Sequence, residues 1–338
     1  MAKTLQVIQD RAYDDASTVL PVEYARGLYV ENPPSAAALK LMHLLIAKAG
    51  GALAEDRSHS FRLADLRAVE GMKNHDRATL RPLFVELAAA VMVWDDTEAQ
   101  NEVIGGFMDR AKLDYRHEIS DDLIVTWWFG GAFREMAEKS NLWAILDRQT
   151  VFALSSKYSI LLFQHFASLQ GLEHKSAKAF TLPELRTLLG VPAGKLVRWT
   201  HLNRDALQPA IAEINQLARF TLTATVQKVG RSVSGVTISW EPKPDPTDAK
   251  RELARPKVGR KARRDGTAEA PAPAFPENGS IRWTSWEALV WEHAPKPTPD
   301  MELVGAKFRD FCAGRGLPLT AAGIEKTFVA WVSKFRVG

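Results

Sequence analysis

One sequence pattern occurs twice in the chain, and this repeat constrains the fold more than any other feature. The segment FRLADLRAVEG at residues 61–71 matches FTLPELRTLLG at residues 180–190 at its phenylalanine, leucine, arginine and glycine positions. A second match follows, because LRPLFVEL at residues 80–87 shares its leucine, proline and glutamate spacing with LQPAIAEI at residues 207–214. The offset is 119 residues for the first match and 127 for the second, so the later copy carries eight additional residues between its anchors. Two matches in the same order predict a duplicated structural unit.

The later copy has a recognisable order of predicted elements. KYSILLFQHFASLQG is predicted to be helical and to end at Gly171, and LPELRTLL is predicted to be a helix with Thr181 as its N-cap and Pro183 in its first turn. Gly190 is predicted to end that helix. A longer helix, LNRDALQPAIAEINQLARF, is followed by the alternating strands TLTATVQKV and VTISWEP around the turn GRSVSG. Three helices followed by a two-stranded hairpin is the order of a winged helix.

The earlier copy repeats this order and then extends it. Its three predicted helices are AAALKLMHLLIAKAGG, the segment FRLADLRAVEG, and ATLRPLFVELAAA. The strands VMVWDD and EVIGGFM follow around an acidic turn. Further strand-like segments, KLDYRHEI and LIVTWWF, and a predicted helix, GAFREMAEKSNLWAIL, connect the earlier copy to the later one.

The remaining sequence predicts a linker and a small module. Residues 242–280 are rich in proline, alanine and charge without an apolar period, which predicts a flexible linker. In the tail, apolar residues recur at helical spacing, and we expect Trp283, Trp286 and Trp331 to be buried in its core. The predicted class is therefore α+β, with tandem winged helices as a pseudo-repeat. The expected boundaries are an N-terminal arm at 1–35, winged helices at 36–150 and 151–241, the basic linker at 242–280 and an all-α module at 281–338.

Composition excludes several classes of protein. Cys312 is the only cysteine, which excludes a disulfide framework and a cysteine-based zinc site and predicts a reducing compartment. No secretory signal and no membrane-spanning segment are recognisable, so we expect a cytoplasmic protein with no membrane partner. The net charge of +4 permits nucleic-acid binding. The basic run KRELARPKVGRKARR at residues 250–264 is equally typical of a solvated arm and of an arm that attracts phosphates.

The third helix of the later copy has two predicted faces. Leu207, Ile211, Ile214 and Ala218 form one stripe at helical spacing, which is expected to pack inward. In a helix-turn-helix unit the opposite face enters the major groove, where arginine can pair with guanine and glutamine with adenine. That face is predicted to carry Arg198, His201, Asp205, Gln208 and Ala212, with Arg204 at its edge.

Two further groups of residues are candidate DNA contacts. In the earlier copy the same helical phase turns Asn74, Ala78 and Arg81 outward, with Arg77 at the edge. Beside the turn GRSVSG, Lys228 and Arg231 could contact phosphates or the minor groove. Exposed helices and hairpin tips also carry such residues simply as solvated side chains, and winged helices also bind proteins. Pro82 and Pro209 make the phase upstream of each less secure, because proline bends a helix.

Taken in order, SSKYSILLFQHFASL, FTLPELRTLLGV and LNRDALQPAIAEIN resemble the C-terminal winged helix of the iteron-binding, theta-type plasmid replication initiators, over roughly residues 151–240. The resemblance implies a protein that binds direct repeats in double-stranded plasmid origin DNA through both winged helices. It implies a protein of the bacterial cytoplasm that helps to open adjacent A·T-rich DNA and recruits the host origin-binding ATPase and replicative helicase. It also implies a monomer–dimer equilibrium, with dimers formed through the first winged helix. The linker and the tryptophan-rich tail depart from the family pattern, so the resemblance implies no role for them.

No group of residues predicts catalysis. The chain has no His-x-His pair for a nuclease metal, and its five tyrosines include no matching nucleophile pair. The segment GVPAGKL is one residue short of a phosphate-binding loop, and Leu196 stands where such a loop needs serine or threonine. We therefore expect a protein that is not an enzyme and needs no cofactor or metal. A transcriptional regulator that binds operator DNA and a winged-helix scaffold for other proteins stay open as alternatives.

Overall fold

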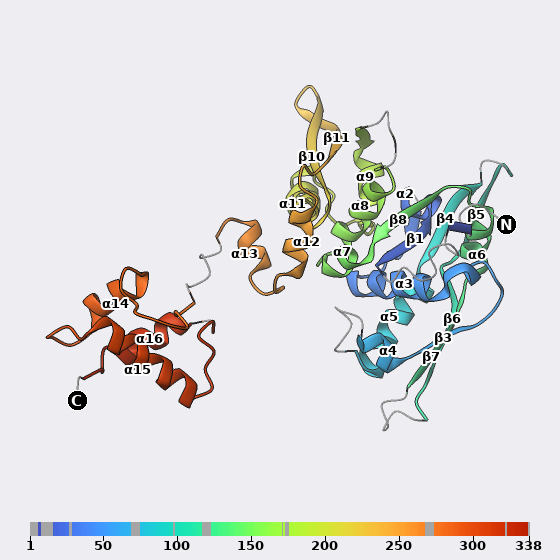
Figure 1. Cartoon of the computed structure of the whole chain (residues 1–338). Coiled ribbons are helices and arrows are strands. Elements are labelled where there is room, and N and C mark those ends of the chain that lie inside the picture. Colours follow the sequence, from blue (N-terminus) through green and yellow to red (C-terminus); the bar gives the residue numbers. More distant parts are fainter. Residues whose placement is uncertain are drawn as a thin grey trace. The chain divides into compact units, whose positions relative to one another are not determined.

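The structure is a computed structural model that describes residues 6–7, 16–26, 29–68, 75–96, 99–116, 123–170, 172, 176–267, 274–321 and 323–336. The chain forms two compact units, Met1–Lys257 and Val258–Gly338, and each has its own hydrophobic core. Figure 1 shows the helices and strands of both units. The larger unit contains both copies of the repeat. No helix in the described parts of the chain is long and apolar enough to cross a membrane.

The later copy folds as a winged helix. Its three strands form one antiparallel sheet in the order β10-β11-β9, and its helices pack on the core of the larger unit. The predicted order of helices and hairpin is therefore confirmed. The elements are α8 (Lys157–Ala167), β9 (Ala177–Thr181), α9 (Leu182–Leu188), α10 (Trp199–Leu202), the π-helix η3 (Asn203–Leu207), α11 (Gln208–Leu217), β10 (Phe220–Val229) and β11 (Ser232–Pro242).

The repeated motif begins and ends helix α9 as its sequence predicts. Thr181 is the N-cap, with its hydroxyl 3.3 Å from the backbone nitrogen of Glu184, whose carboxylate lies 2.7 Å from the Thr181 nitrogen. This reciprocal capping box satisfies two backbone donors that a helix start leaves unpaired. Gly190 follows the helix with φ of 59°, a left-handed conformation that favours glycine. A Cβ atom there would also lie 2.8 Å from the end of the Leu161 side chain, so a larger residue would require Leu161 to shift.

The earlier copy spreads the same elements over two sheets. Strand β3 pairs with β7 instead of with the hairpin β4–β5, so the sheet orders are β2-β4-β5 and β3-β7-β6. The chain passes from one sheet to the other at Phe107, between β5 and β6. The elements are α3 (Ala36–Ala49), η1 (Gly50–Ala52), β3 (His59–Arg62), α4 (Leu63–Ala68), α5 (Arg77–Ala89), β4 (Val91–Asp96), β5 (Asn101–Gly106), β6 (Met108–Asp114), β7 (Ile124–Phe129), α6 (Gly131–Lys139), β8 (Trp143–Asp147) and α7 (Arg148–Ala153).

The N-terminal segment differs from the predicted arm. It forms β1 (Ser17–Pro21), α2 (Val22–Arg26) and β2 (Tyr29–Glu31), and its side chains Leu20 and Tyr24 are buried in the core. Strand β1 pairs antiparallel with β8 along its whole length. The same pairing corrects the long helix predicted at residues 131–146, because that helix ends at Lys139 and the segment WAIL becomes β8. Backbone partners from β1 decide between helix and strand here.

The predicted linker is partly helical. Helix α12 (Thr247–Ala254) contacts α11, with Ala249 and Leu253 buried. Its Glu252 carboxylate also lies 3.1 Å from the Gln216 amide nitrogen. Two apolar residues four positions apart are enough to hold one face of a two-turn helix, although they are too few to show a period in the sequence. Within the basic run, α13 (Arg260–Arg264) is a further short helix, so that run is not a structureless arm.

The smaller unit is helical, as predicted. Its helices are α13, α14 (Ser285–His293), α15 (Met301–Gly314) and α16 (Ile324–Val332), and its core contains edge-on contacts among the rings of Phe275, Trp286, Phe308 and Phe328. Trp286 is buried and Trp331 packs at the edge of this core. The prediction for Trp283 is wrong, because that side chain is 91% exposed. Trp283 precedes the N-cap of α14 and has φ of 66°, so its backbone turns before the helix begins.

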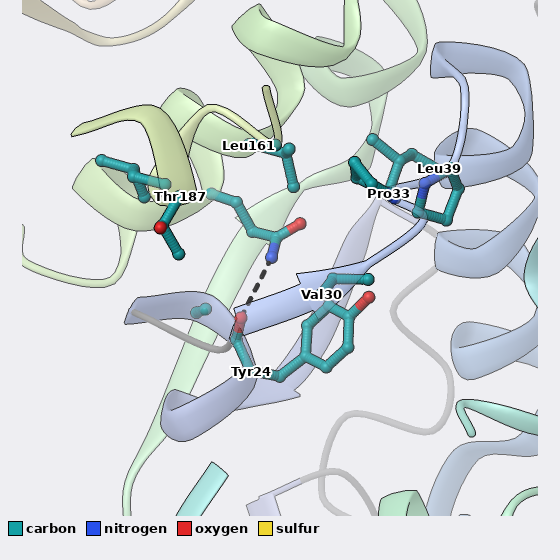
Figure 2. A pocket seen from close by; sticks show the side chains of 11 residues that line it. Tyr24, Val30, Pro33, Leu39, Leu161 and Thr187 are labelled. Atoms are coloured by element: carbon teal, nitrogen blue, oxygen red, sulfur yellow. Dashed lines mark hydrogen bonds between the residues drawn. The ribbon is translucent and has the colours of Figure 1, made fainter. Parts of the chain in front are cut away.

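A buried polar contact joins the first helices of the two copies. His43 of α3 and Gln164 of α8 are fully or almost fully buried, and the His43 Nε2 atom lies 3.2 Å from the Gln164 Oε1 atom. The Gln164 amide also donates to the carbonyl of Tyr24 at 3.4 Å, as Figure 2 shows. A cavity of about 30 Å³ lies beside this contact, and residues of both copies line it. The two copies are therefore packed together through a shared core.

This contact makes a prediction about stability and pH. Burial lowers the pKa of His43 from its ordinary 6.5 to about 4. Between these two pH values, His43 is protonated in the unfolded chain and neutral in the folded chain. Its contribution to the free energy of unfolding is therefore fully present above about pH 6.5 and is lost as the pH falls towards 4. We expect His43 to remove about 2 kcal/mol of unfolding free energy between pH 7.5 and pH 5, measured by urea denaturation.

The matched variants separate this titration from the rest of the protein. His43→Gln keeps a hydrogen-bonding side chain and has no imidazole to protonate, so its loss of stability at pH 5 should be smaller than that of the wild type by about the same amount. His201→Gln changes an exposed histidine and should lose as much stability as the wild type. An acid loss in His43→Gln equal to that of the wild type would contradict the assignment.

Candidate nucleic-acid interface

The third helix of the later copy presents one apolar and one polar face. Its inner side chains Leu207, Ile211 and Ile214 and the following Ala218 are buried, as the helical period predicts. On the opposite side the structure leaves the polar residues in solvent, with Ala212 half-buried among them. The exposed members are Arg198, His201, Arg204, Asp205 and Gln208.

A π-helical turn lies within this third helix. The backbone N–H of Gln208 donates to the carbonyl of Asn203, five residues earlier, and Pro209 then follows in the first turn of α11. Proline has no N–H for the carbonyl four residues before it, and its ring clashes with that carbonyl in a regular helix. The wider turn accommodates Pro209 without ending the helix, so the residues on both sides of it belong to one continuous element.

Two pairs of polar side chains lie on the exposed face. The Arg204 guanidinium donates to Asp205 through Nε at 2.6 Å and Nη2 at 2.8 Å. The Gln208 side-chain amide donates to Asn203 Oδ1 at 3.2 Å. The hydrogen bond from Arg204 holds the pKa of the Asp205 carboxyl below its usual range, so this side chain is ionised at neutral pH. The face therefore combines donors and acceptors in fixed pairs.

The corresponding helix of the earlier copy is α5. Asp76 caps it by accepting from the Thr79 nitrogen at 2.8 Å, and Leu80, Leu83, Phe84 and Leu87 are buried. Ala78 and Arg81 are exposed on the other side, while the Arg77 guanidinium lies 4.8 Å from the centre of the Tyr115 ring. Asn74 lies outside the described residues, so its position in the predicted face stays a prediction.

The arginine of the repeated motif has the same task in both copies. Arg67 donates to the carbonyl of His75 at 2.9 Å, directly before helix α5. Arg186 donates to the carbonyls of Lys195 and Leu196, directly before helix α10. In each copy the second helix thus fixes the loop that leads into the third. This explains why the arginine recurs where the loops differ in length.

The hairpin of the later copy carries the two predicted cations near its tip. Lys228 lies in β10 beside a break in the strand register, and Arg231 occupies the turn. Both side chains are exposed. Gly230 has φ of 60°, the conformation that a two-residue hairpin turn with glycine first requires. Figure 1 shows the long β10–β11 hairpin that carries this tip. The two cations are therefore exposed at the end of a long hairpin, where they are accessible to a binding partner.

Comparison with known protein families matches both copies. A model described as "Initiator Replication protein, WH1" matches residues 29–167, and one described as "Initiator Rep protein, WH2" matches residues 181–240, which together is more than half of the chain. The chain belongs to the initiator Rep protein family. Its two copies are the WH1 and WH2 winged helices of that family.

Solved structures and curated proteins add the following. A crystal structure of the Pi initiator protein in complex with iteron DNA is 18% identical, with a TM-score of 0.48 over 68% of this chain and 98% of that one. A structure of domains 2 and 3 of RctB is 12% identical, with a TM-score of 0.35 over 62% of this chain and 83% of that one. No curated protein matches the chain.

Sequence reasoning missed one residue of this initiator's exposed face. Asn203 contacts Gln208 only because the π turn brings positions five apart together, and such positions do not face each other in an α-helix. The proline after Gln208 is the signal that could have revealed the wider turn. Among the described residues, no group of three or more His, Cys, Asp and Glu side chains could hold a metal ion.

The exposed face predicts the effect of two substitutions. Arg198→Ala and Gln208→Ala should each weaken binding to the target duplex by about 1–3 kcal/mol for each base that the side chain reads. Folding should be unchanged, because both side chains are exposed. Fluorescence anisotropy with labelled duplex measures the first effect, and thermal melting the second.

Arg57→Ala is the matched control, since Arg57 is an exposed arginine of the larger unit whose partner is Glu55 and which is not a candidate DNA contact. It should bind the target with nearly wild-type affinity. If Arg198→Ala and Gln208→Ala behaved like Arg57→Ala, the placement of the base-reading face would be wrong.

Proposed function

We propose that this initiator binds direct repeats, or iterons, in the origin of a plasmid and that both of its winged helices enter the DNA. Family membership supports a role in replication initiation. The observation that carries the DNA-binding proposal is the two-faced third helix of each copy. In the later copy this helix consists of α10, η3 and α11, where leucine and isoleucine pack inward while arginine and glutamine face solvent. In the earlier copy it is α5, where leucine and phenylalanine pack inward while Arg81 faces solvent.

The exposed residue types fit the edges of bases. Arginine donates two parallel hydrogen bonds to guanine, and glutamine both donates to and accepts from adenine. In a helix-turn-helix unit the residues at the N-terminal end of the third helix lie nearest the bases of the major groove. Arg198 and His201 lie at that end of the helix. Lys228 and Arg231 on the hairpin are then free to contact phosphates or the minor groove, which adds affinity without base readout.

A chain with two reading helices fits a repeated target. Each helix occupies one major-groove segment, and two such segments on one face of a duplex lie about one helical turn, or 10 bp, apart. A direct repeat presents the same pair of segments several times in one orientation. We extend the proposal to the later steps of initiation, in which the bound protein promotes opening of A·T-rich DNA and recruits the host origin-binding ATPase and replicative helicase. We also assign to WH1 the contacts of a dimer.

Footprinting of the DNA that flanks the gene tests the proposal most directly. We expect protection of several direct repeats next to an A·T-rich tract, and the protected sites should share one sequence. Protection of inverted repeats alone would indicate an operator and would favour a transcriptional regulator. Absence of any protected sequence would contradict sequence-specific DNA binding and would leave a protein scaffold as the function.

The hairpin cations make a separate prediction about salt. Replacing both Lys228 and Arg231 with Ala removes two candidate phosphate contacts, so the slope of log affinity against log salt should become shallower by about 2. Affinity should fall equally for the target repeat and for an unrelated duplex, because phosphates carry no sequence information.

Lys326→Ala, at an exposed position of α16 in the smaller unit, is the matched control and should leave the slope unchanged. A double variant with the wild-type slope, or one that loses affinity only for the target repeat, would show that the hairpin does not hold phosphates.

A further inference from the structure

We infer that Asn203 and Asp205 are positioning residues that set which base Gln208 and Arg204 read. The inference rests on the proposed function and deepens it, because it assigns an adenine contact to Gln208 and a guanine contact to Arg204. It is carried by the two side-chain pairs on the exposed face of the third helix and by the π turn between them.

The first pair depends on the shape of the backbone. In a regular α-helix, positions five apart lie about 140° apart around the axis, so their side chains do not meet. The π turn at Asn203–Leu207 rotates Gln208 back towards Asn203, and the Gln208 Nε2 atom comes within 3.2 Å of the Asn203 Oδ1 atom. The turn that accommodates Pro209 therefore also creates this contact.

The hydrogen bond fixes which way the Gln208 amide faces. It uses one of the two N–H donors of Nε2 and leaves the other donor and the Oε1 acceptor unoccupied by the described residues. A donor beside an acceptor is the pattern that matches N7 and N6 of adenine in the major groove. Without Asn203 the amide can rotate, and the same side chain presents its donors and acceptor in any order.

The second pair acts in the same way on an arginine. Asp205 accepts from Nε and from one N–H of Nη2 of Arg204, which is one side of the guanidinium fork. The other side, made of Nη1 and the second N–H of Nη2, has no partner among the described residues. Two parallel donors at the end of an arginine match O6 and N7 of guanine.

Stability does not account for these pairs. Both lie on an exposed face, where ion pairs and side-chain hydrogen bonds contribute little to folding. Asp205 also places a negative charge on a surface proposed to approach phosphates, which lowers affinity for any DNA. Asp205 therefore lowers the affinity for DNA of any sequence and orients Arg204. Both effects favour discrimination between bases over tight binding.

The experiment uses the full chain and a pool of double-stranded oligonucleotides with randomised positions, and sequences the bound fraction. The variants are Asn203→Ala, Gln208→Ala, Arg204→Ala, Asp205→Ala and Asp205→Asn. Gln208→Ala should reduce preference for adenine at one position by roughly 5- to 150-fold, the value of one bidentate pair. Asn203→Ala should reduce preference at that same position by about threefold or more, and the double variant should be no worse than Gln208→Ala.

The Arg204 pair gives a second, independent signature. Arg204→Ala and Asp205→Ala should both reduce preference for guanine at one position, distinct from the adenine position. Asp205→Ala should at the same time bind unrelated duplex more tightly, because it removes a negative charge. Asp205→Asn keeps an acceptor for Arg204, so it should gain the same general affinity and lose less guanine preference than Asp205→Ala.

Controls distinguish this inference from the function on which it rests. Asp248→Ala removes the exposed ion pair between Asp248 and Arg251, elsewhere in the larger unit. This variant should change no base preference. A wild-type chain that enriches a sequence, with Asn203→Ala and Asp205→Ala enriching it equally, overturns this inference alone. An equal loss of base preference at all positions in these two variants also overturns the inference, since a positioning residue acts at one position. A wild-type chain that enriches nothing overturns the proposed function and this inference with it.

Discussion

The apolar stripe of the third helix is the constraint on which the proposed DNA contacts depend. Burial of Leu207, Ile211 and Ile214 fixes the rotation of the helix about its own axis. Each such side chain stabilises the fold by about 1.5–3 kcal/mol when buried, whereas an exposed ion pair contributes about 0–1 kcal/mol. Packing therefore decides which residues face solvent, and the polar residues occupy the positions that remain. The same reasoning applies to α5, where Leu80, Leu83 and Leu87 are buried.

Features with local causes could be predicted from the sequence. The capping box at Thr181 and the glycine turn at Gly230 are decided by residues within a few positions of each other, and the duplication aligned the weaker copy with the stronger one. Features with distant partners could not be predicted. Strand β8 forms because β1 lies beside it, more than a hundred residues away in the chain. Likewise β3 pairs with β7, and no property of residues 59–62 distinguishes β7 from the hairpin strand that the repeat suggests.

The candidate site shows the same division. Helical periodicity predicted that Arg198, His201 and Gln208 share one outward face, and the structure leaves all three side chains exposed. The period could not reveal the contact between Asn203 and Gln208, because it assumes a regular helix. Nor could it reveal why the motif arginine recurs. Arg67 and Arg186 donate to backbone carbonyls of the following loop. Every residue has such a carbonyl, so the residue types do not indicate which one accepts.

The contact between His43 and Gln164 joins equivalent positions of the two copies. Each residue is the eighth after the serine that caps its helix, Ser35 or Ser156, so the two copies meet through equivalent positions. In a symmetric pair of identical chains both positions carry the same residue. Here one chain supplies both partners, so one position can donate while the other accepts. Of the two residues only His43 can then take up a proton. Because both copies belong to one chain, their contact does not depend on the protein concentration.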